Sequence, residues 1–216
     1  MIDEAASVAK KQARPRRRAE QREATRLALI DAAIDCLTEE GYGALTTRRI
    51  AERAEVAQST LMHHFETREA LLVEAIAVLA SRLAEDALEK IDLASLRSPE
   101  HREAVLDQAW LQFTAPPALA AAQLWVAAWS EPELAATLRE IELRLSSIIV
   151  TTSSTLFPDL AEDPRLLGLI DAAVSLIRGL VMAIPVVGRE LVDARWEAIK
   201  PLIVEASSQF LDEPAA

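Results

Sequence analysis

Apolar residues recur at steps of three and four over most of this chain, which is the spacing of one face of an α-helix. The first clear case lies between residues 25 and 40, at Leu27, Ile30, Ile34 and Leu37. Gly41 and Gly43 follow directly, and glycine commonly stands just past the end of a helix. The pattern therefore predicts a helix over residues 25–40.

Residues 46–72 show the same spacing in shorter pieces. The predicted order is an N-cap at Thr46, a helix over 47–54, a turn at 55–57, a helix over 58–64, and a long helix from a cap at Thr67 to about Lys90. Small residues stand where the two short helices must cross. This arrangement is typical of the helix-turn-helix motif, which places its second helix in the major groove of DNA.

Beyond residue 90 the spacing predicts five further helices. They are expected to begin at Ser98, Ala118, Ser130, Arg165 and shortly before Val192. Pro116-Pro117 is expected to break a helix, and Ser130–Glu133 to form a capping box. With few glycines and abundant Ala, Leu and Glu, the composition also favours helix, so we predict an all-α fold of about nine helices.

Residues 169–187 are nearly all apolar, which raises the question of a membrane span. Asp171 and Arg178 lie inside this stretch, and charges at the middle of a bilayer are costly, so we expect a helix buried on both sides. The last helix carries a seam for a partner helix at Val192, Trp196, Ile199, Ile203, Ala206 and Phe210.

The net charge of −11 is unevenly distributed. The first 70 residues carry 12 basic and 12 acidic residues, so the excess acid lies in the rest of the chain. Local charge decides contact with phosphates, so the total does not exclude DNA binding. Basic residues are dense in residues 1–24, which we expect to form a flexible arm that follows DNA or is simply a solvated tail.

Other chemistry finds little support in the sequence. The adjacent pair His63-His64 points about 100° apart on a helix and cannot chelate one ion, so no metal site is expected. No phosphate loop or nucleophile motif occurs, so we expect neither an enzyme nor a cofactor. The single Cys36 and the lack of a leader segment favour a reduced, cytoplasmic protein.

The stretch IDAAIDCLTEEGYGALTTRRIAERAEVAQSTLMHHFETREALL closely resembles the DNA-binding domain of TetR-type (tetracycline-repressor) bacterial regulators. The tryptophan-rich segment from Trp110 to Trp129 is similar to the betaine-responsive branch of that family. The resemblance implies DNA contacts at Thr47, Arg48, Gln58, Ser59, Thr60, His63, His64 and Arg68. Among these, Gln58 is suited to bond adenine, and Thr60 offers a methyl group to thymine.

Three positions depart from the family pattern. Glu55 stands where a turn glycine is usual, which implies a turn without glycine or a strained residue. Met62 replaces a tyrosine that often contacts phosphate. Arg68 replaces a lysine and keeps its charge with a different geometry.

The resemblance divides the chain into an arm at residues 1–24, a helix-turn-helix domain at 25–70, and an effector-binding and dimerisation domain at 71–216. Candidate effector-pocket residues are Trp110, Phe113, Trp125, Trp129, Arg178 and Met182. An inward-facing Arg178 would suit an effector with a carboxylate, whereas pairing with an acidic residue would remove that hint. Candidate dimer-interface residues, on the last two helices, are Leu169, Ala173, Ile177, Trp196, Ile199 and Ile203.

These features predict a homodimeric repressor that binds a palindromic operator in double-stranded DNA and is released by a small, largely apolar effector. An alternative is a DNA-organising or scaffold protein of the same fold that takes no effector. The large side chains proposed for the pocket can equally be core residues.

Overall fold

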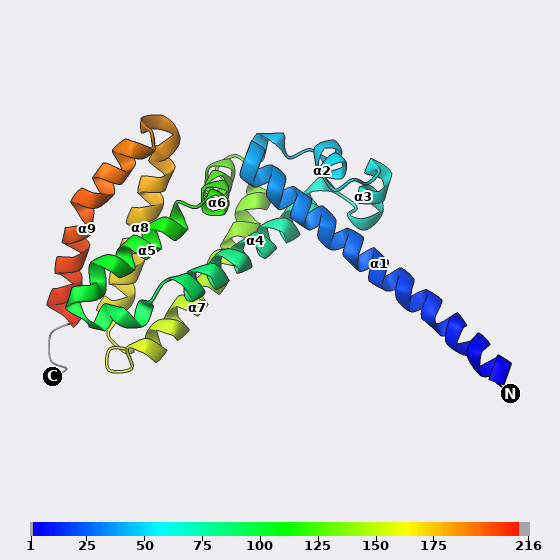
Figure 1. Ribbon diagram of the computed structural model, residues 1–216. Helices are drawn as coiled ribbons and strands as arrows, with labels where there is room; N and C mark the ends of the chain where they lie inside the picture. The colour runs from blue at the N-terminus through cyan, green and yellow to red at the C-terminus, as the bar shows by residue number, and fades with distance from the viewer. Residues whose placement is uncertain (1, 212–216) are drawn as a thin grey trace. The chain divides into compact units, whose positions relative to one another are not determined.

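A computed structural model describes the backbone of residues 2–211, and every regular element in that range is helical (Figure 1). Nine α-helices and three short 3₁₀ helices follow one another there, which confirms the predicted all-α fold. The chain divides into two compact units, residues 1–78 and 79–216. Met1, the chain beyond Leu211 and the side chains of residues 2–16, 209 and 210 lie outside the described part, so the predicted seam position Phe210 does too.

The first unit contains α1 (Ile2–Glu40), α2 (Thr47–Arg53), α3 (Gln58–His64) and the first half of α4 (Arg68–Lys90). A 3₁₀ turn, η1 (Tyr42–Ala44), joins α1 to α2. The second helix packs on α1, and α3 packs on α2. Apolar side chains from all four helices and the loops between them are buried, among them Leu29, Cys36, Leu45, Ile50, Leu61, Phe65 and Leu71.

Two threonines begin helices in this unit as the sequence predicts. The Thr46 hydroxyl accepts a hydrogen bond from the Arg49 amide (3.2 Å), and the Thr67 hydroxyl accepts one from the Ala70 amide (3.0 Å). Each satisfies an N–H that the first turn of a helix leaves without an intrahelical partner. The positions of α2 and α4 therefore follow from local chemistry as well as from burial.

The first helix differs from the expectation for residues 1–24. The structure describes residues 2–24 as part of α1, continuous with the stretch predicted as helix, whereas the sequence predicts a flexible arm. Many residues there, including Ala, Arg, Lys, Glu and Gln, are good helix formers. The flexibility of this segment in the free protein stays a prediction.

The second unit contains the end of α4 and five further α-helices. These are α5 (Arg102–Phe113), α6 (Pro116–Ala127), α7 (Pro132–Leu156), α8 (Pro164–Val187) and α9 (Arg189–Leu211). Two 3₁₀ helices, η2 (Leu93–Arg97) and η3 (Pro99–His101), connect α4 to α5. Gly188, at φ 85°, allows the tight reversal after which α9 packs along α8.

The helix break expected at Pro116-Pro117 is present, since α5 ends at Phe113 and a separate helix follows. That helix begins at Pro116, two residues earlier than expected, because the first turn needs no donor from the proline nitrogen. The expected capping box does not form. Glu131 occupies the N-cap position of α7 but its side chain does not cap the helix, and the Ser130 hydroxyl donates to the Ala127 carbonyl (3.2 Å).

The core of the second unit is built around two tryptophans. The rings of Trp110 and Trp196 stack with their centroids 4.9 Å apart and an interplanar angle of 5°. The Trp110 indole N–H donates to Asp193 (2.9 Å), and the Lys200 ammonium, itself buried, donates to Asp107 (2.8 Å). Ile177, Val181 and Val192 complete the buried cluster.

Helix α8 is not buried on both sides within the described chain. It is long and apolar enough to cross a membrane by length and composition, yet only Leu166, Ile177 and Val181 are buried along it. Its other side is open, and a β-carbon added at Gly168 or Gly179 would meet no atom within 4 Å. One face of α8 is therefore left uncovered by the described residues of the single chain.

Candidate functional site

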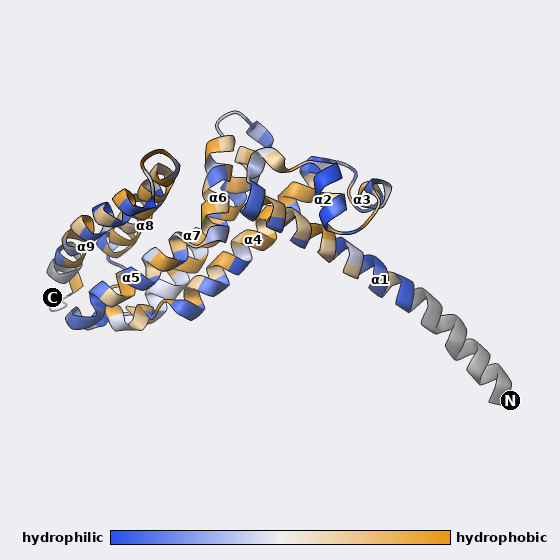
Figure 2. Cartoon of the chain, turned by 45° about the horizontal axis from the view of Figure 1, so that its top comes forward, coloured by the Kyte–Doolittle hydropathy of each residue, from blue (hydrophilic) through white to orange (hydrophobic). Residues whose placement is uncertain are grey.

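The turn between α2 and α3 sets the orientation of the two helices of the helix-turn-helix motif. Glu55, the first turn residue, adopts φ 56°, a left-handed conformation unusual for a residue with a side chain. The Val56 amide then donates to the Ala51 carbonyl (3.0 Å), which closes the end of α2. The sequence expectation of a strained residue in place of glycine agrees with this geometry. Figure 2 shows hydrophilic residues over much of α2.

The N-termini of α2 and α3 are joined by a side-chain hydrogen bond. The Gln58 Nε2 atom donates to the Thr47 Oγ1 atom over 2.9 Å. Gln58 and Ser59 are exposed, and Thr60 is half-buried. Since the N-terminal residues of a recognition helix normally face base edges, this places polar groups where readout requires them.

The three arginines of α2 have different surroundings. Arg49 donates to Glu40 (2.9 Å) and Arg53 to Glu39, both at the end of α1. Arg48 has a side chain that is 80% exposed and only a 3.4 Å contact with Glu52. Of these arginines, Arg48 is therefore the most accessible to a phosphate or a guanine edge.

The two adjacent histidines lie at the C-terminal end of α3 in unlike environments. His63 is exposed, whereas His64 is half-buried and its Nδ1 atom is buried without a hydrogen-bond partner. Burial lowers the pKa of His64, and the nearby cations Arg22, His63 and Arg26 lower it further. His64 is thus held neutral near pH 7, which weakens its expected attraction for phosphate.

Arg68 is directed into the protein. Its Nε atom donates to the Leu45 carbonyl (2.6 Å), and its guanidinium lies over the Tyr42 ring at 5.7 Å. This side chain ties the start of α4 to the loop before α2. The geometry favours a structural role over the expected backbone contact with DNA.

These elements also match known proteins. Residues 29–75 match the model for bacterial regulatory proteins of the tetR family. The HTH-type transcriptional regulator BetI of Rhizobium meliloti (strain 1021) is 30% identical over 162 residues, covering 72% of this chain and 75% of that regulator. The chain belongs to the TetR family.

Solved structures support the same fold across both units of this TetR-family regulator. A transcriptional regulator of Streptomyces coelicolor A3(2) superposes with a TM-score of 0.61 at 24% identity, covering 88% of this chain and 99% of that one. The multidrug binding protein EbrR, complexed with ethidium, gives a TM-score of 0.60 at 20% identity, covering 84% and 97%. Because the family consists of transcriptional regulators, the expectation that the chain is not an enzyme is confirmed.

The six predicted effector-pocket residues do not gather around one cavity. Trp110 belongs to the core, and Phe113 packs against that core. Trp129, by contrast, is 90% exposed at the end of α6. Trp125 and Met182 are half-buried, and the Arg178 guanidinium stacks over Trp125 at 4.4 Å.

Arg178 also has an acidic partner. Its guanidinium lies 3.4 Å from Glu142 of α7. The charge that could have recognised a carboxylate on an effector is therefore compensated within the protein. This contact removes the reason for expecting an effector with a carboxylate.

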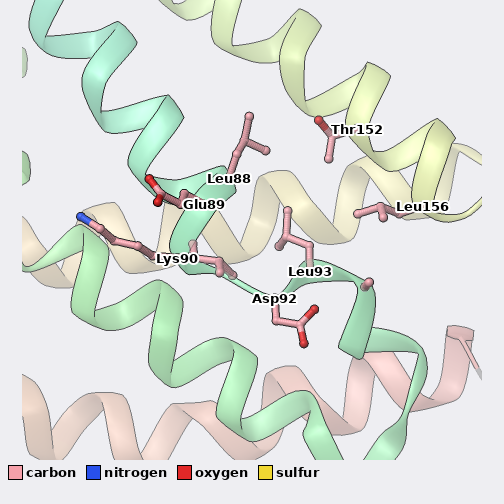
Figure 3. A pocket seen from close by; sticks show the side chains of 9 residues that line it. Leu88, Glu89, Lys90, Asp92, Leu93, Thr152 and Leu156 are labelled. Carbon is pink, nitrogen blue, oxygen red and sulfur yellow. The ribbon is translucent and has the colours of Figure 1, made fainter.

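Two hollows exist elsewhere in the described part of the second unit. A cavity of about 450 Å³ lies at the ends of α4 and α7, and Figure 3 shows Leu88 on one side with Thr152 and Leu156 on the other. A smaller cavity of about 100 Å³ is lined almost wholly by apolar groups, including Leu106, Phe157 and Ile170, with Arg102 in its wall. Sequence spacing gave no signal for either, since each is assembled from distant segments.

The predicted dimer residues face the subunit's own interior in several cases. Trp196 is 1% exposed and Ile177 is buried in the same cluster, so neither can contribute much to a partner. Leu169, Ala173 and Ile203 line the smaller cavity, and Ile199 is half-buried.

The exposed sides of α8 and α9 carry other residues. On α8 one exposed row is made of small residues at steps of four, three and four, namely Gly168, Ala172, Ser175 and Gly179, and Leu167, Asp171 and Val186 are exposed as well. On α9 the exposed apolar row is Leu191, Ala194, Ala198 and Leu202. Sequence reasoning favoured the large side chains and so selected other sides of these helices. The step pattern of the small residues was the signal that could have found them.

Proposed function

We propose that this TetR-family regulator is a homodimeric repressor that binds a palindromic operator and is released from it by a small, largely apolar effector. The observation that carries the DNA-reading part is the row of polar side chains at the starts of α2 and α3, in which Gln58 is exposed and is oriented by Thr47. Arg48 beside it offers an accessible positive charge. These side chains match the donors and acceptors of base edges and phosphates.

A second copy of the chain accounts for the open sides of α8 and α9. Small residues let two helix backbones approach closely, and the leucines of α9 add apolar area. Pairing both helices across a two-fold axis would form a four-helix bundle and bury on the order of 1,200 Å² or more. The dimer would set the separation of the two recognition helices, so each meets one half-site.

The effector is proposed to be mainly apolar because the smaller cavity of the second unit is lined almost wholly by apolar groups and Arg178 is already paired. EbrR, which shares the fold, is described as a multidrug binding protein and was solved with ethidium. This likeness supports the proposal that the second unit of the present chain binds an organic molecule. Enlargement of a small cavity on binding would couple effector and DNA affinity, with a typical coupling free energy of about 1–3 kcal/mol. As for other members of the family, the site of action is the cytoplasm.

One experiment tests the core of the proposal. The full-length protein is used to select duplexes from a random pool, and the enriched sequence is then searched for beside its own gene. We expect two inverted half-sites about one helical turn apart, and stronger expression from that promoter when the gene is deleted. Enrichment of no sequence, or lower expression after deletion, would contradict DNA reading and repression respectively.

One observation favours the alternative of a DNA-organising protein without an effector. The aromatic residues expected to line a pocket are divided between core and solvent. That protein would select no consensus duplex, would protect DNA at many weak sites, and would show no thermal shift with ethidium or other apolar cations.

A further inference from the structure

A row of basic residues runs along α1 at every fourth position. Arg18, Arg22 and Arg26 follow this spacing in the part of α1 whose side chains are described, and the sequence continues it upstream with Lys10 and Arg14. Residues four apart are neighbours on one face of an α-helix. Glu20 stands two positions from both Arg18 and Arg22, which places it on the opposite side.

The fold of the first unit does not use this part of the helix. Residues 17–24 are all exposed, and the first buried residue among those whose side chains are described in α1 is Leu29. Like charges four positions apart destabilise a helix. The spacing of Arg18 and Arg22 therefore lowers the stability of the helix, and a polyanion beside the row would offset this repulsion.

The C-terminal end of the row adjoins the recognition helix. The Arg26 guanidinium lies over the ring of Phe65, the residue that ends α3, at 4.8 Å from its centroid. Arg26 is anchored there by an ion pair with Glu74 of α4. Arg22, one turn away, is close enough to His64 to influence its titration. The row thus starts beside α3 and continues away from it along α1.

We propose that the exposed part of α1 that carries Arg18 and Arg22 is a helical arm that binds the sugar–phosphate backbone of DNA flanking each half-site. This inference rests on the proposed DNA binding and adds a second, sequence-independent contact to it. From Arg18 to Arg26 the described part of the row spans about 12 Å at 1.5 Å per residue. That length corresponds to roughly a third of a turn of DNA, which carries a charge about every 1.7 Å along its axis.

This contact differs from the reading of base edges. Phosphates are the same at every base pair, so the arm would raise affinity for long duplexes without changing the preferred sequence. It would also stabilise the arm's own helix by neutralising its repulsion. Both effects weaken as salt concentration rises.

The test uses the full chain and the duplex that it selects from a random pool. The duplex is prepared in two lengths, one ending at the outer edges of the half-sites and one extended by a helical turn, about 10 base pairs, on each side. The variant carries Arg18→Gln and Arg22→Gln. The matched control carries Arg139→Gln and Arg144→Gln, two exposed arginines of α7, and loses the same charge.

We expect the unmodified protein and the control to bind the long duplex more tightly than the short one. The Arg18/Arg22 variant should lose that gain, and its slope of log affinity against log salt on the long duplex should fall by about 0.9 for each lost contact, or about two per subunit. Its affinity for the short duplex should stay the same, as should its circular dichroism at high salt.

If the unmodified protein binds both duplex lengths equally, the proposed contact between the arm and DNA is wrong. The same holds if the α7 control loses as much affinity for the long duplex as the Arg18/Arg22 variant does. If the variant loses affinity only for vesicles of phosphatidylcholine and phosphatidylserine, the row binds a membrane surface and the inference is wrong. If no duplex is enriched from the pool, the proposed function fails instead. The two lengths can then still be compared with random sequence, so the arm is tested separately.

Discussion

Gln58 and Thr47 are bonded to each other across the helix-turn-helix, with 2.9 Å between Nε2 and Oγ1. The amide nitrogen of glutamine has two hydrogens, so one remains to bond a base while the other holds the side chain in place. The carbonyl oxygen of the same amide remains an acceptor. A side chain fixed in this way loses less entropy when it meets adenine, which needs one donor and one acceptor.

Replacing Gln58 with alanine should weaken binding to the selected duplex by about 1–3 kcal/mol and relax the preference at one base pair. Thr47→Val should weaken binding in the same direction with a smaller effect, because it removes the hydroxyl that orients Gln58 but keeps the Gln58 amide. Affinities for a panel of duplexes, each changed at one base pair, measure both changes. If Gln58→Ala weakens binding equally to random DNA, Gln58 does not read a base.

Glu55 provides a prediction about the stability of the first unit. A left-handed conformation costs a residue with a β-carbon about 1–2 kcal/mol, and glycine avoids most of this cost. Glu55→Gly should therefore raise the free energy of opening of α2 and α3 by about 1 kcal/mol, after the extra freedom of glycine in the unfolded chain is allowed for. Hydrogen exchange of the α2 and α3 amides reports that free energy.

Glu55→Ala serves as the matched control, since it removes the same carboxylate and keeps a β-carbon. It should leave the protection of α2 and α3 nearly unchanged. Equal stabilisation by alanine and glycine would show that the effect comes from the carboxylate and that the backbone at this turn is not strained.

The helix-turn-helix could be predicted closely because its signals are local. Thr46 and Thr67 accept the amide hydrogen bonds expected of caps, and α3 spans the predicted Gln58–His64. Even the departure at Glu55 pointed to an unusual turn. Spacing could not show that Arg68 turns inward to the Leu45 carbonyl, because that contact joins residues far apart in sequence.

The second unit was harder to predict because apolar spacing identifies a helix face without saying what covers it. Ile177 and Trp196 were assigned to a partner subunit, but they pack in the subunit's own core. Trp110 and Trp129 were assigned to one pocket, but they lie in core and solvent. Assigning such residues requires the packing of several helices, and no single stretch of sequence contains that information.

Substitutions of Trp110 and of Trp129 distinguish a role in the core from a role in effector binding. Trp110→Ala should destabilise the second unit by about 3–5 kcal/mol, because it removes a buried ring that stacks on Trp196. Trp129→Ala, at a site that is 90% exposed, should stay within about 0.5 kcal/mol. Urea unfolding followed by circular dichroism of the helices compares the two variants.

A small effect of Trp110→Ala would mean that its surroundings are loose enough to admit a ligand. Trp129→Ala should then be tested by its effect on ethidium binding. Loss of that binding with normal stability would return Trp129 to the effector site.

His64 should make the first unit sensitive to acid. Burial, together with Arg22, His63 and Arg26, holds the pKa of His64 below its ordinary value of about 6.5. Between the folded and unfolded pKa values the unfolded chain binds more protons, so the stability present above pH 6.5 is lost as pH falls toward the folded pKa. Hydrogen exchange at several pH values should show less protection of α3 at about pH 5.5 than at pH 7.

His64→Leu should remove this pH dependence, and it should cost little at pH 7 because the buried Nδ1 atom has no partner to lose. The ¹H–¹³C signals of the ring give its titration midpoint directly. A midpoint above the ordinary value of about 6.5 in the free protein would contradict the proposed environment. A midpoint that rises on DNA binding would show that His64 approaches a phosphate after all.

Ser175 lies in the middle of the open row on α8, between Ala172 and Gly179, and is exposed in the single chain. Within the subunit an arginine there points into open space, so Ser175→Arg should leave the helix content unchanged. In a two-fold dimer the substitution appears twice at the closest approach of the helices, where bulk clashes and unpaired charge is costly. The variant should therefore be a monomer at micromolar concentration in sedimentation, and should bind a duplex with one half-site as tightly as a duplex with two.

Ser146→Arg, at an exposed serine of α7, is the matched control and should sediment as the unmodified protein does. If Ser175→Arg remains a dimer, the subunits associate through another surface.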